Sequence, residues 1–206
     1  MRTAARLLLI EADALPPLLA SVPAEHFDRP SPCDGWSVRD VLAHCSAALG
    51  SLVAGTMGGF TPEENQRDVD ERSTWPLQAV IDDLVINYAE AAQRIDELGG
   101  AADGLGLGEW VHGGDVREPL GLPNAYCSAG IELALELLSD RSVQREAPPV
   151  EVVVDGAALS FGVGPSTGRL VTDTETLVRL VAGRRPDPAR YELTGDVTPA
   201  ALVLFR

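Results

Sequence analysis

The spacing of apolar residues divides the chain into a longer helical part and a shorter part that contains strands. Up to about residue 146, apolar positions recur every three or four residues in several segments, which is the period of a helix with one buried face. From Ala147-Pro148-Pro149 onward, apolar and polar positions alternate, as they do in half-buried strands. We therefore expect a mainly α fold, with a helical bundle over residues 1–146 and a small α+β domain over residues 147–206.

The predicted helices are separated by segments rich in glycine and proline. Ser37, with Asp40 three residues later, has the pattern of a capping box, so a helix should begin near Val38. Residues 55–72 are rich in glycine and acidic side chains, and we expect a long loop there. The other helices are expected over about Thr3–Ser21, Thr74–Leu98 and Asn124–Ser139, with a shorter one over Leu107–Arg117.

The last part of the chain predicts a small sheet and two helices. Three short antiparallel strands are expected over residues 151–154, 159–163 and 169–172. The segment Gly164-Pro165-Ser166-Thr167-Gly168 matches the G-x-S-x-G pattern of a nucleophile elbow, but no histidine follows it and a strand is expected next, so we interpret it as a hairpin turn. Thr172 and Glu175 then predict a helix that ends at Gly183, and a last helix is expected over residues 199–205.

Composition and charge narrow the classes of partner. The formal net charge of -15 and a pI near 4.5 would repel phosphate backbones and anionic lipid headgroups, so nucleic acid and membrane surfaces are not expected partners. All 16 basic residues are arginine, which excludes Schiff-base chemistry and a Walker phosphate loop. Cys33, Cys45 and Cys127 form no C-x-x-C pair and are odd in number, which favours a reducing compartment. The apolar run near the start is too short for a signal peptide, and we expect a cytoplasmic protein.

Three histidines limit the chemistry that the chain can carry. His26 lies in a loop-like context and is expected to be solvated, whereas His44 borders the apolar stripe of a predicted helix. Glu109 and His112 are three residues apart, so on a helix both would stand on one face and could reach one cation. With His44 from a facing helix, they would give the two imidazoles and one carboxylate of a catalytic zinc site, and the alternative is that the histidines are structural. Asp115 has three open roles: it accepts a hydrogen bond from an imidazole that binds the metal, it substitutes as a metal ligand, or it is a turn residue.

Two longer motifs carry a resemblance to a known family. The stretch from Ser31 to His44, SPCDGWSVRDVLAH, and the stretch from Val111 to Gly121, VHGGDVREPLG, are similar to the two signatures of the mycothiol-dependent maleylpyruvate isomerase family. Leu193-Thr194-Gly195-Asp196 and Gly183-Arg184-Arg185-Pro186 resemble its small sterol-carrier-like C-terminal domain. The resemblance implies a DinB-like four-helix bundle that holds a divalent metal, usually zinc, through two histidines and a carboxylate.

Carried onto this chain, the resemblance makes His44 and His112 the two imidazole ligands. The family pattern places its glutamate four residues before the second histidine, where this chain has Gly108, and Glu109 is the nearest replacement. The implied activity is a mycothiol-dependent, metal-activated thiol isomerase or S-transferase acting on a small electrophile, as a monomer or homodimer. The rival is a non-catalytic DinB-like ligand-binding or regulatory protein without an intact metal site, which Gly108 favours.

Two further groups of residues have expected roles beside this centre. Cys33 lies just before a predicted helix N-terminus, which can lower the pKa of a nearby thiol, whereas the other cysteines are expected to be buried hydrophobes. Arg67, Arg72 and Arg117 could pair with an acidic ligand, but solvated surface arginine is the expected state of each.

Overall fold

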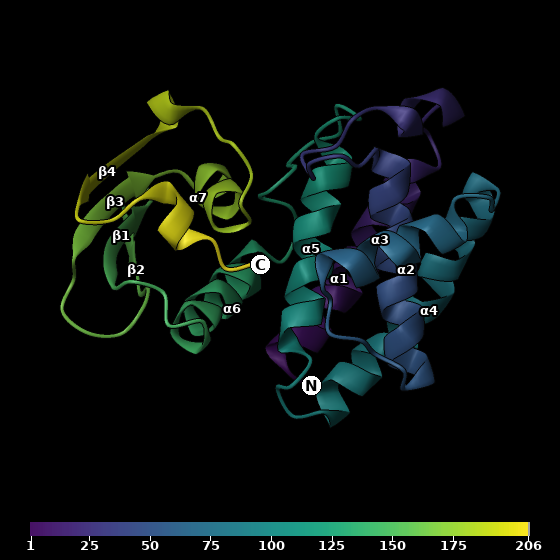
Figure 1. Cartoon of the computed structure of the whole chain (residues 1–206), viewed down its shortest axis with the longest axis horizontal. Helices are drawn as coiled ribbons and strands as arrows, with labels where there is room; N and C mark the ends of the chain where they lie inside the picture. Colours follow the sequence, from purple (N-terminus) through teal and green to yellow (C-terminus); the bar gives the residue numbers. More distant parts are fainter. Residues whose placement is uncertain (206) are drawn as a thin grey trace. The chain divides into compact units, whose positions relative to one another are not determined.

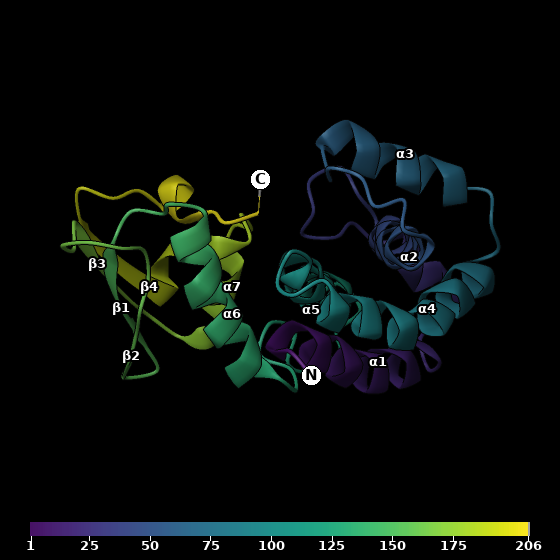
Figure 2. The same ribbon diagram turned by 90° about the horizontal axis from the view of Figure 1, so that it is seen from below.

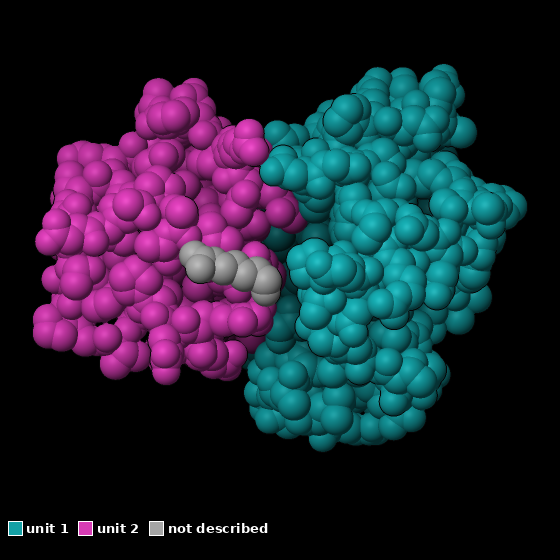
Figure 3. All heavy atoms as spheres, in the orientation of Figure 1, with its two compact units in different colours: residues 1–130 teal, residues 131–206 magenta. Residues whose placement is uncertain are grey.

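The computed structural model describes residues 1–205, which fall into two compact units. The first unit is Met1–Gly130 and the second begins at Ile131, as the two colours in Figure 3 show. The boundary predicted near residue 147 coincides with the change from helix to strand, whereas the compact units divide one helix earlier. Among residues 1–205, no helix combines the length and the apolar content needed to cross a membrane.

Four helices of the first unit form the bundle, confirming the predicted fold. Helix α2 packs on α4, α4 on α1, α1 on α5 and α5 back on α2, while α3 lies outside against α2 (Figures 1 and 2). The buried positions of α1 and α2 are occupied mainly by leucine, valine and alanine. The helical elements of this unit are α1 (Thr3–Leu19), η1 (Ala24–Asp28), α2 (Val38–Ala54), α3 (Pro62–Arg72), α4 (Leu77–Glu97) and α5 (Asp103–Arg117).

Local sequence explains where α2 begins. The Ser37 hydroxyl accepts a hydrogen bond from the Asp40 amide at 3.2 Å, and the Asp40 carboxylate accepts one from the Ser37 amide at 2.8 Å. This reciprocal capping box starts α2 at Val38, as predicted. At the other end Gly55 adopts a left-handed conformation and stops the helix.

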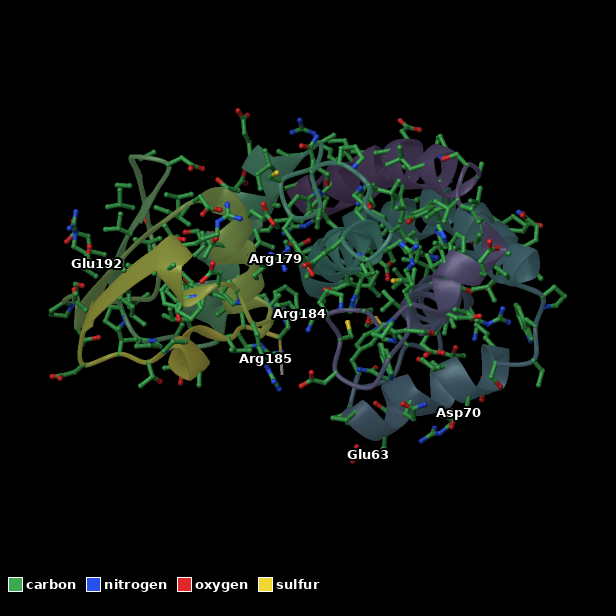
Figure 4. All side chains as sticks on the ribbon, turned by 90° about the horizontal axis from the view of Figure 1, so that it is seen from above. Glu63, Asp70, Arg179, Arg184, Arg185 and Glu192 are labelled. Carbon is green, nitrogen blue, oxygen red and sulfur yellow. The ribbon has the colours of Figure 1, made fainter. Side chains whose placement is uncertain are left out.

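The loop predicted over residues 55–72 is wrong for its second half, which forms α3. Thr61 caps this helix and Glu64 completes a second capping box, so its start is encoded locally. The helix contains a single buried residue, and side chains such as Glu63 and Asp70 point away from the bundle (Figure 4). A helix that buries so little shows no apolar periodicity, which is why the sequence pattern predicted a loop.

Glycines in α5 allow it to approach its neighbours closely. The helix begins at Asp103, four residues before the predicted start at Leu107. A Cβ atom at Gly106 would lie 2.6 Å from the Ala4 carbonyl oxygen on α1, so only glycine fits there. The packing of α5 on α1 therefore outweighs the low helix propensity of glycine, which costs about 1 kcal/mol relative to alanine.

The second unit is a four-stranded mixed sheet with helices. It comprises α6 (Ile131–Gln144), β1 (Val150–Val154), β2 (Ala157–Leu159), β3 (Gly168–Thr172), α7 (Thr174–Val181), η2 (Pro188–Arg190), β4 (Tyr191–Gly195) and η3 (Pro199–Leu202). The strand order is β2-β1-β3-β4, and α6 and α7 lie on one face of the sheet (Figures 1 and 2). Alternate residues of β1 are buried, which confirms the alternation in the sequence.

Several details of the second part differ from the prediction, which had three strands and did not include β4. Strands β1 and β3 are parallel, not antiparallel, so the segment Gly164–Gly168 is part of a crossover connection and not a hairpin turn. The helix predicted from Asn124 begins at Ile131, because Asn124 adopts a positive φ of 57° that no helix start uses. Residues 199–205 hold only the short turn η3 in place of a full helix.

Candidate metal centre

The two histidines that the sequence singled out lie side by side in the bundle. His44 projects from α2 and His112 from α5, and their ring centroids are 5.2 Å apart in an edge-to-face arrangement. Trp36, in the segment before α2, packs on His44 with ring centroids also 5.2 Å apart. The two sequence motifs thus place one imidazole on each of two packed helices, and the two rings meet between α2 and α5.

The imidazole of His44 is neutral, and one of its ring nitrogens makes no hydrogen bond within residues 1–205. Its side chain is 6% exposed, and among residues 1–205 its Nδ1 atom has no hydrogen-bond partner. Burial, and then the neighbouring His112, lower the pKa of His44 to about 3. A neutral imidazole with a buried, unpartnered nitrogen is the form that binds a metal ion, and leaving such an atom unpaired costs free energy.

A fully buried carboxylate joins His112 to two other side chains. Oδ2 of Asp115 lies 2.9 Å from Nδ1 of His112 and accepts a hydrogen bond from the Cys33 thiol at 3.2 Å. Oδ1 of Asp115 accepts a hydrogen bond from the Tyr126 hydroxyl at 2.5 Å. Because Asp115 is buried inside α5, it is not a turn residue, and its other two predicted roles stay open.

The sequence pattern did not single out Tyr126. It lies in the segment after α5, outside any periodic pattern, and reaches Asp115 only because Gly114 has no side chain. A Cβ atom at Gly114 would come within 2.4 Å of the Tyr126 ring. The pair of glycines after His112 was the available signal, since neighbouring glycines in a helix indicate close packing by another group.

Glu109 is buried in α5 and has Cys45 as its partner. Its carboxylate accepts a hydrogen bond from the Cys45 thiol, and burial is the main cause that raises its pKa to about 8. Within residues 1–205, the one group of three or more metal-ligating side chains whose donor atoms all lie within 4.8 Å is Cys33, His112 and Asp115. The structure therefore brings the rings of His44 and His112 side by side and groups His112 with Asp115 and Cys33, while His44 and Glu109 both lie outside that group of three.

The arginines near the bundle have structural partners. The sequence predicted a solvated Arg117, and this is wrong, because the side chain is 1% exposed. Its guanidinium donates hydrogen bonds to both carboxylate oxygens of Glu11 at 2.6 and 3.0 Å. Gly113 makes room for this pair, because a Cβ atom there would lie 2.0 Å from Glu11. Arg72 donates to Ser46 at 3.0 Å and pairs with Asp83, whereas Arg67 is exposed.

The residues at this point fit a divalent cation. Imidazole nitrogen, thiolate sulfur and carboxylate oxygen are the donors that zinc takes in proteins. The unpartnered Nδ1 atom of His44 is a buried polar atom that a cation would satisfy.

Together, the bundle and its paired histidines define a DinB-like helical protein with a candidate metal centre between two helices. The model of the mycothiol maleylpyruvate isomerase N-terminal domain matches residues 8–119, and the chain belongs to that family. This confirms the resemblance carried by the two sequence motifs. No curated protein matches the sequence significantly.

Solved structures share the fold over the whole chain. The crystal structure of a mycothiol-dependent maleylpyruvate isomerase aligns with a TM-score of 0.64 at 15% identity, covering 97% of this chain and 96% of that one. A histidine-to-alanine mutant of a mycothiol-dependent maleylpyruvate isomerase aligns over the same shares, with a TM-score of 0.61 at 14% identity. At such identities the similarity concerns the fold, which extends through the second unit.

Proposed function

We propose that this chain is a mycothiol-dependent, metal-activated thiol isomerase or S-transferase that acts on a small electrophilic substrate. The observation that carries the proposal is the convergence of His44 and His112, with ring centroids 5.2 Å apart, one from each family motif. Family membership and the shared fold support mycothiol as the thiol. Zinc is the metal that the nitrogen, oxygen and sulfur donors favour.

The roles of the chain's own residues follow from their surroundings. A bound divalent cation would favour the deprotonated form of an incoming thiol at neutral pH. His44 is neutral over the physiological range and carries a free nitrogen for the cation, while in the metal-free chain Asp115 lies against Nδ1 of His112 and restricts its ring. Trp36 covers one side of His44 and helps to exclude water.

A thiol-consumption assay tests this function. Mycothiol would be mixed with a panel of electrophiles that includes activated cis double bonds and alkylating agents, with and without a chelator. We expect consumption or double-bond isomerisation with mycothiol, little with glutathione, and loss of both activities on chelation. Equal rates with the two thiols would refute the cofactor, and rates unaffected by the chelator would refute the metal.

One observation favours a second candidate, a non-catalytic DinB-like protein that binds a ligand or regulates a partner. Gly108 stands where the family pattern has its glutamate, and a Cβ atom there would meet nothing within 4 Å. The nearest acidic residue, Glu109, is engaged by Cys45. Under this candidate, neither mycothiol nor the electrophiles would be consumed even by protein that has taken up zinc.

A further inference from the structure

We propose that Cys33 and Asp115 complete the metal centre of this chain, so that the cation is held by two imidazoles, one carboxylate and one thiolate, with Glu109 outside the coordination sphere. This inference rests on the proposed function and names the ligands of the same site, where an incoming thiol would enter as a fifth ligand. It rests on donor geometry, a free buried nitrogen and charge balance.

Three of the four donor atoms lie close enough together to share one ion, and the nitrogens of His44 lie outside that group of three. Cys33 Sγ lies 3.8 Å from His112 Nδ1 and 3.2 Å from Asp115 Oδ2, and those two atoms are 2.9 Å apart. With bond lengths of about 2.0–2.3 Å, tetrahedral zinc holds neighbouring donors about 3.3–3.8 Å apart, so the 2.9 Å hydrogen bond between His112 Nδ1 and Asp115 Oδ2 would have to open. Small rotations of three side chains would therefore let these atoms surround a single ion.

A second observation points to the same place. Nδ1 of His44 is buried without a hydrogen-bond partner among residues 1–205, and its ring lies against that of His112. A buried polar atom without a partner costs about 1–3 kcal/mol. A cation between the two rings would satisfy it.

The surroundings orient the carboxylate and the thiol toward this point. The hydroxyl of Tyr126 holds Oδ1 of Asp115, which leaves Oδ2 to face His112 and Cys33. The Cys33 backbone is fixed in its loop, since its amide donates to the Ser31 hydroxyl at 3.2 Å and its carbonyl accepts from the Trp36 amide at 3.0 Å. Both donors are thus positioned before any ion binds.

Charge balance supports this set of ligands. Two neutral imidazoles, one carboxylate and one thiolate carry a total charge of minus two, which neutralises a divalent cation. Because Cys33, Asp115 and His44 are all buried, an unbalanced ion would pay a large desolvation penalty. On binding, the Cys33 thiol would lose its proton to solvent and the sulfur would bond to the cation.

Cobalt(II) added to the chelator-treated full-length protein tests the ligand set. We expect one equivalent of Co²⁺ to give the visible bands of a tetrahedral site together with a near-ultraviolet thiolate-to-cobalt charge-transfer band. Cys33→Ser should abolish the charge-transfer band and weaken Co²⁺ binding by at least about tenfold. Asp115→Asn should weaken Co²⁺ binding by a similar factor. Cys127→Ser, which changes a partly exposed cysteine, and Glu109→Gln should leave both the band and the affinity unchanged.

The outcomes separate this inference from the proposed function. A wild-type protein that binds Co²⁺ without a charge-transfer band refutes Cys33 as a ligand and leaves the metal itself in place; this readout needs no variant to fold. Survival of the band in Cys33→Ser, or loss of Co²⁺ binding in Glu109→Gln with Asp115→Asn unaffected, also overturns the ligand set. Absence of any Co²⁺ or Zn²⁺ binding refutes the metal-activated function as well.

Discussion

Removing one partner of the buried ion pair between Glu11 and Arg117 should destabilise the bundle far more than removing one partner of an exposed pair. Replacing Glu11 by leucine leaves the guanidinium of Arg117, which is 1% exposed, without its two hydrogen bonds of 2.6 and 3.0 Å. Removing one partner of such a pair costs about 3–5 kcal/mol. Arg117→Met should cost less, because the Glu11 carboxyl can take up a proton whereas a guanidinium cannot lose one. The double variant should cost less than the sum of the singles.

Urea unfolding followed by tryptophan fluorescence measures these free energies. Trp36, Trp75 and Trp110 all lie in the first unit, so the signal reports the bundle. The matched control is the surface pair Arg94 and Glu97, both 48% exposed, whose loss should change stability by at most about 0.5 kcal/mol. A cost below about 1 kcal/mol for Glu11→Leu, or strictly additive singles, would contradict the reasoning.

Three further predictions concern single side chains. Burial raises the pKa of Glu109 to about 8, above its usual value of 4.5. The metal-free protein should therefore lose stability as the pH rises from about 4.5 to 8, by up to about 1.4 kcal/mol per pH unit. Denaturation at several pH values should show a flatter slope for Glu109→Gln. Gly106→Ala should destabilise the bundle by about 1–3 kcal/mol, because the new Cβ atom meets the Ala4 carbonyl at 2.6 Å. Gly108→Ala is its control and should be neutral or stabilising by up to about 1 kcal/mol, since open space surrounds that position; equal melting temperatures for the two variants would contradict the close packing. Ser37→Ala should cost about 1 kcal/mol through loss of the helix cap, and an unchanged midpoint of unfolding would show that the cap is dispensable.

The sequence predicted those parts of the fold whose signals are local or periodic. The capping box at Ser37 fixed the start of α2, and the apolar stripes located α1, α2 and α4 to within a few residues. Helix α3 was missed because it buries a single residue and therefore has no apolar period. The parallel pairing of β1 with β3 was also missed, since alternation within a strand carries no information about its partner.

The candidate site was predicted in part for a similar reason. His44 and His112 follow from two motifs on two helices, so their meeting needs only that α2 and α5 pack together. The direction of an acidic side chain is harder to infer, because a spacing of three residues sets a face of the helix but not a neighbour. Glu109 contacts Cys45. Asp115 contacts His112 and also accepts a hydrogen bond from Tyr126, whose position depends on how the loop after α5 folds.

The metal content of the purified protein tests the central claim most directly. After removal of bound metal and titration with Zn²⁺, the wild-type chain should take up one equivalent, and His44→Ala and His112→Ala should each abolish this uptake. His26→Ala is the matched control, because His26 lies in η1 outside the candidate centre, and it should retain full uptake. A wild-type chain that binds no zinc, or uptake that survives the loss of both His44 and His112, would contradict the account.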